Sequence, residues 1–113
     1  AMQESISGYA FTDEETEEAL FRVFKEVQYL LDPHGAVGYL AIESYLRKSN
    51  NKVRPILLET AHPAKFKPDV ERIIGHEIEV PERLARLADV EKVATAMSVD
   101  YDAMRDFLLE RYG

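Results

Sequence analysis

The chain has 113 residues, of which 46% are hydrophobic and 31% charged, a composition typical of one globular domain or part of one. Its net charge of −7 argues against a nucleic-acid partner, because the neutralisation of phosphates requires clustered Lys and Arg. The lack of cysteine excludes disulfides and thiolate chemistry, and no apolar run approaches the roughly 18 residues of a membrane span.

The first elements are a short strand and a helix. Residues 6–11 alternate weakly and include Tyr9 and Phe11, which predicts the strand. Thr12 and Glu15 have the spacing of a capping box, which predicts that a helix begins here. The acidic residues of its first turns indicate a solvated helix start rather than a metal site. Its buried stripe would consist of Leu20, Val23, Phe24 and Val27.

A second helix is predicted from the N-cap Asp32, followed by proline, to about Lys48. Residues 35–42 contain no charge, which indicates a buried helix. Gly35 and Gly38 each cost roughly 1 kcal/mol relative to alanine, so something should approach the backbone closely here. Tight packing on another element is favoured over contact with a ligand.

Residues 53–59 contain a continuous apolar run and predict a strand that is covered on both faces. The strand ends at Thr60, directly before a turn that contains His62. Proteins of the α/β class place ligands where a strand ends in a small polar residue before a helix. The sequence therefore predicts one ligand edge, at residues 60–65.

Helices are predicted at residues 66–74, 81–88 and 100–111, with an irregular or briefly extended segment at 89–99. Their inward residues would be Phe66, Val70, Ile73 and Ile74 in the first, Leu84 and Leu87 in the second, and Met104, Phe107 and Leu108 in the third. The predicted fold class is α/β, helix-rich, with few strands and about five helices.

The three histidines do not form a helical metal-binding pair, because no two of them have the i, i+4 spacing. His34 and His62 each lie at a predicted junction beside a proline, where each would either touch a ligand or hydrogen-bond a loop carbonyl. His76 is expected to be an exposed residue at a helix end. The five glycines form no phosphate-binding loop.

Two runs of sequence resemble the threonine synthase family. Residues 60–66, Thr-Ala-His-Pro-Ala-Lys-Phe, resemble the signature near the C-terminus of the bacterial and fungal type of these enzymes. Residues 32–39, Asp-Pro-His-Gly-Ala-Val-Gly-Tyr, resemble the family's acidic-P-H-x-A-V-x-Y segment. Residues 70–75, residues 80–85 and the closing helix continue the resemblance, which covers nearly the whole chain from Thr12.

The resemblance implies a fold type II pyridoxal-phosphate enzyme of the tryptophan-synthase β-like group. Such an enzyme converts O-phosphohomoserine and water to threonine and phosphate, with the cofactor as electron sink. Thr60 matches the residue that hydrogen-bonds the pyridine nitrogen. His62, Lys65 and His34 are candidates for lining the pocket, and Lys65 would either pair with a phosphate or be a solvated lysine. No metal is expected.

The family's Schiff-base lysine and glycine-rich phosphate loop have no counterpart here and would lie upstream. The resemblance therefore implies a C-terminal piece, with residues 3–75 from the cofactor domain and 76–113 as a helical extension. Alone it should neither bind pyridoxal phosphate tightly nor turn over substrate. Its partner would be the upstream cofactor domain, in a cytoplasmic enzyme, and exposed strand edges could cause self-association.

Two other interpretations remain open from the sequence. The chain could belong to another fold type II enzyme that acts on a related phosphorylated or amino-acid substrate. It could also be an α/β interaction module without an active site. The uncharged helix at residues 35–42 argues against the module, because such a helix needs cover on several sides.

Overall fold

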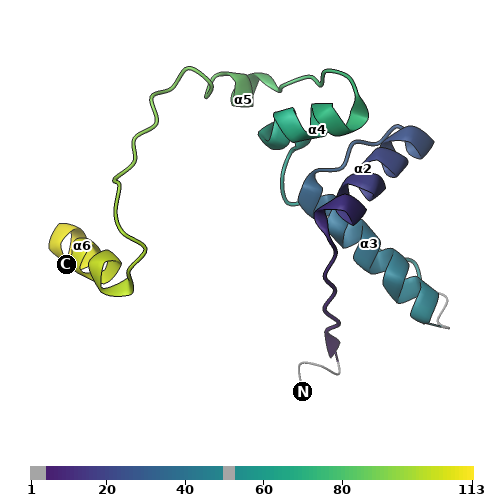
Figure 1. Cartoon of the computed structure of the whole chain (residues 1–113), viewed down its shortest axis with the longest axis horizontal. Helices are drawn as coiled ribbons and strands as arrows, with labels where there is room; N and C mark the ends of the chain where they lie inside the picture. Colours follow the sequence, from purple (N-terminus) through teal and green to yellow (C-terminus); the bar gives the residue numbers. More distant parts are fainter. Residues whose placement is uncertain (1–4, 50–52) are drawn as a thin grey trace.

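The computed structural model describes residues 5–49 and 53–113. These residues form five α-helices and a 3-10 helix, and contain no β-strand (Figure 1). In chain order the elements are α2 (Asp13–Val27), α3 (Pro33–Lys48), the 3-10 helix η1 (Pro63–Phe66), α4 (Lys67–Ile74), α5 (Glu82–Ala85) and α6 (Tyr101–Tyr112). The number of helices agrees with the sequence prediction, whereas the two predicted strands are missing from the described residues.

The first two helices begin where their capping residues predicted. The Thr12 Oγ1 accepts the backbone N–H of Glu15 at 3.2 Å, and the Glu15 carboxylate accepts the N–H of Thr12 at 2.8 Å. The Asp32 carboxylate accepts the N–H of His34 at 2.9 Å, with proline in the first turn of α3. These bonds satisfy backbone donors that a helix start leaves unpaired.

The apolar faces of α2, α3 and α4 meet in a small core, and we call residues 12–49 and 53–78 the packed body. The buried core side chains are Leu20, Val23, Leu31, Ala36, Val70 and Ile74, and Phe24, Leu57, Phe66, Ile73 and Ile78 pack around them. The predicted inward faces of α2 and α4 are thereby confirmed, except at Val27. Val27 is exposed because it lies in the last turn of α2, which ends at the left-handed residue Gln28.

Both glycines of α3 lie against residues 57–59. A Cβ atom on Gly38 would lie 2.7 Å from Cδ1 of Leu57, and one on Gly35 would lie 2.5 Å from Oε1 of Glu59. Both distances are too short for a real side chain. The close approach expected at these glycines is therefore confirmed, and another segment of the chain makes it.

The predicted strands at residues 6–11 and 53–59 are extended but unpaired. A β-strand exists only where a neighbouring strand completes its hydrogen bonds, and neither segment has such a neighbour among the described residues. The expectation of cover on both faces of 53–59 was wrong: Ile56 is 82% exposed and Leu58 80%. The helix α3 packs against one face only.

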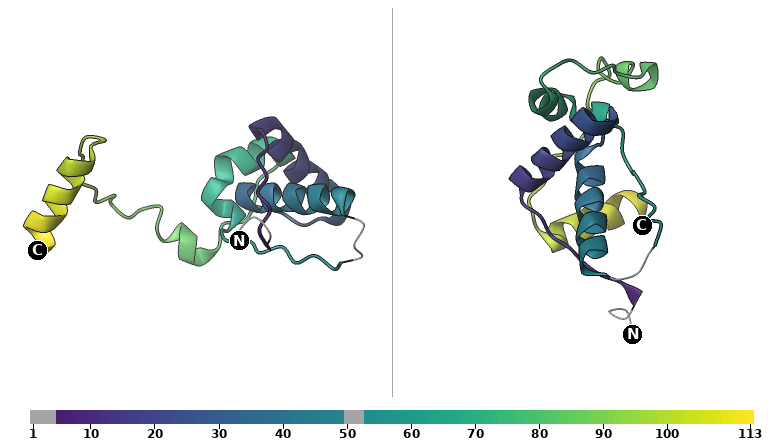
Figure 2. Two further views of the ribbon diagram at one scale, coloured as in Figure 1. Left: turned by 90° about the horizontal axis from the view of Figure 1, so that it is seen from below. Right: turned by 90° about the vertical axis from the view of Figure 1, so that its right-hand side faces the viewer.

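The end of the chain lies apart from the packed body (Figures 1 and 2). We call residues 86–113 the tail, which consists of an extended segment and α6. It raises the radius of gyration to 19.2 Å, whereas a compact chain of this length has about 13 Å. No helix in the described part of the chain has the length and apolar character needed to cross a membrane.

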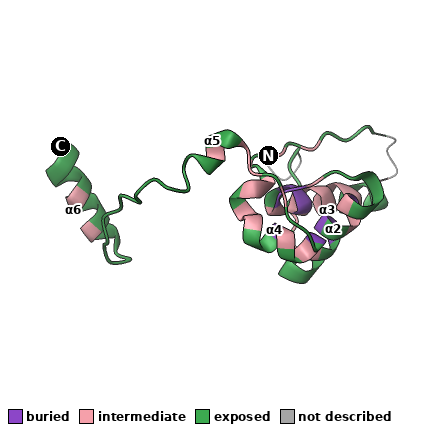
Figure 3. Cartoon of the chain, turned by 90° about the horizontal axis from the view of Figure 1, so that it is seen from above, coloured by how far each residue is buried: buried purple, intermediate pink, exposed green. Residues whose placement is uncertain are grey.

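The structure corrects two predictions near the tail. The helix α5 ends at Ala85 and continues as a turn, so Leu87 is exposed and does not point inward. Met104 and Leu108 of α6 are exposed, and Phe107 is only partly buried. Most of α6 is coloured as exposed in Figure 3. The apolar spacing in α6 was read correctly as helical, but burial requires a partner surface that the described residues do not place there.

Candidate functional site

A cleft of about 510 Å³ lies where the predicted ligand edge meets the start of α5. We call it the Thr60 cleft. Its lining residues come from two stretches of the chain: Glu59, Thr60, Ala61, His62 and Lys65 on one side, and Pro81, Arg83 and Leu84 on the other. The structure therefore brings together three of the four predicted site residues, Thr60, His62 and Lys65.

Thr60 offers an open polar group to this cleft. It lies at the end of the extended segment 53–59 and is exposed. Its hydroxyl has no hydrogen-bond partner within residues 5–49 and 53–113. A hydroxyl can donate one hydrogen bond and accept others, so Thr60 is free to bind a ligand nitrogen or oxygen.

The loop after Thr60 is shaped by His62. The Nδ1 of His62 accepts the backbone N–H of Ala64 at 3.1 Å, and its carbonyl accepts the N–H of Lys65 at 2.9 Å. His62 thus caps η1, with Pro63 in the first turn. The sequence left open whether His62 touches a ligand or bonds the loop; the structure shows a bond from the loop backbone to its ring.

The cleft carries two cations without acidic partners. In the described part of the chain, Lys65 and Arg83 take part in no ion pair, whereas Lys67 pairs with Glu71. The one carboxylate in the lining, that of Glu59, is already occupied by the donors of Tyr29 and Asp32. The Thr60 cleft is therefore suited to an anion, in a chain whose net charge is −7.

His34 does not line the Thr60 cleft. It lies in the first turn of α3, where its Nδ1 is 3.0 Å from a carboxylate oxygen of Asp32 and its ring lies against Phe66. His76 is exposed, as expected, and its ring lies against Phe24. No group of three or more His, Cys, Asp or Glu residues in the described part could hold a metal ion.

Sequence reasoning missed three residues at or beside the cleft: Arg83, Glu59 and Tyr29. The Tyr29 hydroxyl donates to the Glu59 carboxylate at 2.5 Å, and this hydrogen bond raises the pKa of Tyr29. Gly35 was the one available signal, because it predicted a close neighbour without identifying it as Glu59. No local pattern indicated that Arg83 would face Thr60.

Two solved structures resemble this chain. The crystal structure of threonine synthase from Escherichia coli matches 91% of the chain with a TM-score of 0.73 and 37% identity, over 23% of its own length. The structure of PLP-bound threonine synthase from Brucella melitensis matches 96% of the chain with a TM-score of 0.61, over 27% of its length. This chain and the B. melitensis protein are 23% identical in sequence, so their structural similarity shows a common fold only.

Sequence comparison leads to the same family. The sequence model described as "Threonine synthase, C-terminal" matches residues 35–108. Threonine synthase from E. coli strain K12 is 38% identical over 102 residues, and that from Saccharomyces cerevisiae 36% over 93 residues. The chain belongs to the threonine synthase C-terminal family. The alignment with the E. coli relative covers 90% of this chain but 23% of the relative, so the chain spans about a quarter of that protein.

Proposed function

We propose that this chain is the C-terminal part of a threonine synthase that converts O-phosphohomoserine and water to L-threonine and phosphate. The observation that carries the proposal is the Thr60 cleft itself. Within the Thr-Ala-His-Pro-Ala-Lys-Phe run, Thr60 offers a free hydroxyl beside two unpaired cations. Membership of the family and the PLP-bound relative from B. melitensis support pyridoxal phosphate as the cofactor.

The lining residues fit such a cofactor and substrate. The Thr60 hydroxyl would hydrogen-bond the pyridine nitrogen, and the cations of Lys65 and Arg83 suit a phosphate group. His62 keeps the loop between them in shape. When bound, pyridoxal phosphate supplies the electron sink for reactions at the carbons of an amino acid. The apolar side chain of Leu84 also lines the cleft.

Residues from about 3 to 75 would belong to the cofactor domain and residues from about 76 to 113 to a helical extension; residues 3, 4 and 50–52 lie outside the described residues. A second groove, of about 410 Å³, is an argument for an upstream partner domain. It lies between the extended segments 5–9 and 53–56 over α3, and its lining includes Tyr9, Tyr45 and Ile56. We propose that the upstream domain of the same cytoplasmic enzyme covers this face, and that the isolated chain self-associates through it and is inactive.

The experiment is a pyridoxal-phosphate titration of the full-length protein and of this chain, followed by phosphate release from O-phosphohomoserine. Thr60→Val removes the hydroxyl at constant shape, and Thr60→Ser retains it. We expect the full-length protein to bind cofactor and release phosphate, Thr60→Val to weaken cofactor binding about tenfold, and Thr60→Ser to stay close to wild type.

Thr16→Val is the matched control, because the Thr16 hydroxyl donates within α2, to the Thr12 carbonyl, and lies outside the cleft. It should leave cofactor affinity unchanged. A full-length protein that binds the cofactor but releases no phosphate would transfer the assignment to another fold type II enzyme. A full-length protein that does not bind pyridoxal phosphate would refute the proposal.

A further inference from the structure

Glu59, the residue before Thr60, is bonded to the connection between α2 and α3. Its Oε2 accepts the hydroxyl of Tyr29 at 2.5 Å, and its Oε1 accepts the backbone N–H of Asp32 at 2.9 Å. Hydrogen bonds to an ionised carboxylate are among the stronger ones in proteins. One side chain therefore joins the segment that ends at Thr60 to the connection between α2 and α3.

The attachment point on the body is itself fixed. The Asp32 side chain is 0% exposed, and as the N-cap of α3 its Oδ1 accepts the N–H of His34. The adjacent Leu31 is part of the core. The N–H that Glu59 accepts thus belongs to a buried residue with little freedom to move.

Gly35 provides the space that Glu59 occupies. A Cβ atom at residue 35 would lie 2.5 Å from Oε1 of Glu59 and 2.9 Å from its Cγ. Alanine at this helical position would otherwise be favoured by roughly 1 kcal/mol. Glycine at residue 35 therefore makes the helix less stable than alanine would, but it leaves room for the Glu59 carboxylate.

The contact determines which way Thr60 faces. Successive side chains of an extended segment point to opposite sides, and Leu57 and Glu59 both lie against α3. Leu58 and Thr60, which alternate with them along the segment, are exposed. If the segment were shifted by one residue along α3, the Thr60 side chain would turn towards α3 and its hydroxyl would point in a different direction.

We propose that Glu59 is a positioning residue for Thr60: held by Tyr29 and Asp32 in the space left by Gly35, it fixes the orientation in which the Thr60 hydroxyl meets the cofactor. The inference rests on the proposed function for the identity of that ligand. Glu59 acts through Thr60 and is not a catalytic residue.

The first test measures cofactor affinity in the full-length protein. Glu59→Ala should raise the dissociation constant of pyridoxal phosphate about tenfold, and Glu59→Gln, which keeps one acceptor oxygen, should recover most of the loss. Glu43→Ala is the control, because Glu43 accepts two hydrogen bonds from Arg22 and does not line the Thr60 cleft. It should lower the melting temperature without changing the affinity. Wild-type affinity in Glu59→Ala would overturn the inference.

The second test needs no cofactor, so it separates this inference from the proposed function. Gly35→Ala should lower the melting temperature of the wild-type protein, because the new Cβ collides with Glu59, but raise it in the Glu59→Ala background, where only helix propensity remains. Gly8→Ala is the control, since nothing lies within 4 Å of its Cβ position. An equal change in melting temperature on Gly35→Ala in the wild type and in Glu59→Ala would show that the new Cβ does not collide with Glu59.

Amide exchange in the cofactor-free protein completes the test. Both Glu59→Ala and Gly35→Ala should accelerate exchange at the hydrogen-bonded N–H groups of Asp32, Ala64 and Lys65, because each releases the segment before Thr60. The amides of α4 should keep their protection. Unchanged exchange at Ala64 and Lys65 would show that Glu59 stabilises the body without positioning Thr60.

Discussion

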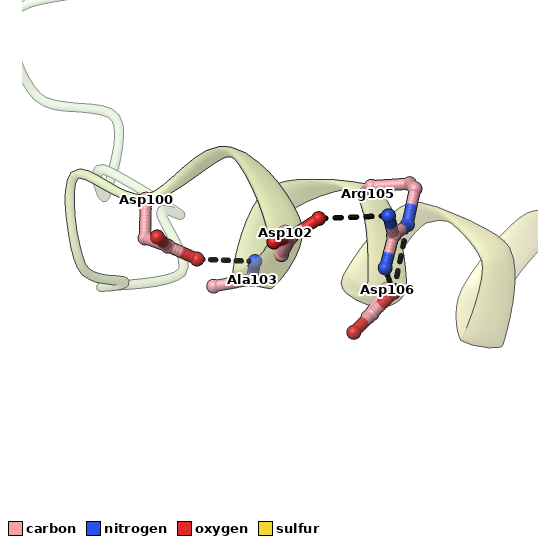
Figure 4. A network of polar contacts seen from close by, with 5 residues as sticks. All are labelled: Asp100, Asp102, Ala103, Arg105 and Asp106. Carbon is pink, nitrogen blue, oxygen red and sulfur yellow. Dashed lines mark hydrogen bonds and ion pairs between the residues drawn. The ribbon is translucent and has the colours of Figure 1, made fainter.

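The helices of the packed body and of the tail both carry large apolar side chains, but the two regions differ in what covers those side chains. Leu20 of α2 is fully buried among residues of α3 and α4, whereas Leu109 of α6 is 61% exposed. The helix α6 is instead held by local polar bonds (Figure 4): Asp100 caps it, and Arg105 pairs with Asp102 and Asp106 at 2.7 Å. Helical sequence thus produces a helix in both regions, while burial depends on a second surface.

The first prediction is the largest in effect and compares one leucine from each region. Leu20→Ala should lower the free energy of unfolding by about 3 kcal/mol, because it leaves a cavity in the core. Leu109→Ala should change it by less than about 0.5 kcal/mol, because the side chain is already in water. Urea unfolding of the two variants checks this. A comparable loss in both would mean that the tail is packed in solution.

The second prediction compares the two helix caps. Thr12→Ala removes a capping box and should lower the free energy of unfolding of the body by about 1 kcal/mol. Asp100→Ala should leave that transition unchanged but reduce the helical circular-dichroism signal of residues 101–112, because an isolated helix of this length is marginal in water. Any shift of the body transition in Asp100→Ala would show that the regions unfold together.

The third and smallest prediction concerns the Arg22–Glu43 pair between α2 and α3. The hydrogen bonds from Arg22 hold the pKa of Glu43 below its ordinary value of 4.5. The resulting stabilisation is complete above pH 4.5 and is lost as the pH falls through the folded-state pKa. Because both side chains are partly exposed, it amounts to about 0.5 kcal/mol.

Unfolding of wild type and Glu43→Gln between neutral and acid pH measures this pair. The stability gap between them should narrow as the pH falls. Asp102→Asn is the control, because it weakens an ion pair inside α6. In this variant the stability of the packed body should depend on pH as it does in the wild type. A constant gap for Glu43→Gln would show that the pair does not couple to folding.

Local chemistry made much of the molecule predictable from the sequence. The caps at Thr12 and Asp32 identified the starts of α2 and α3, because each depends on residues within three positions. The strands at 6–11 and 53–59 could not be decided in the same way, because strand pairing depends on neighbours distant in the chain. The prediction of inward residues in α6 was wrong for the same reason, because burial also depends on segments distant in the chain.

The sequence by itself determined the helices, the family and the run that contains Thr60, because these depend on neighbouring residues and their order. Only the tertiary structure brought Arg83 and Lys65 to the lining of one cleft, and only it placed Glu59 against Gly35, 24 positions apart in the numbering. Such contacts arise when distant segments pack. Their partners are chosen by shape and charge in three dimensions, which no local pattern of residues records.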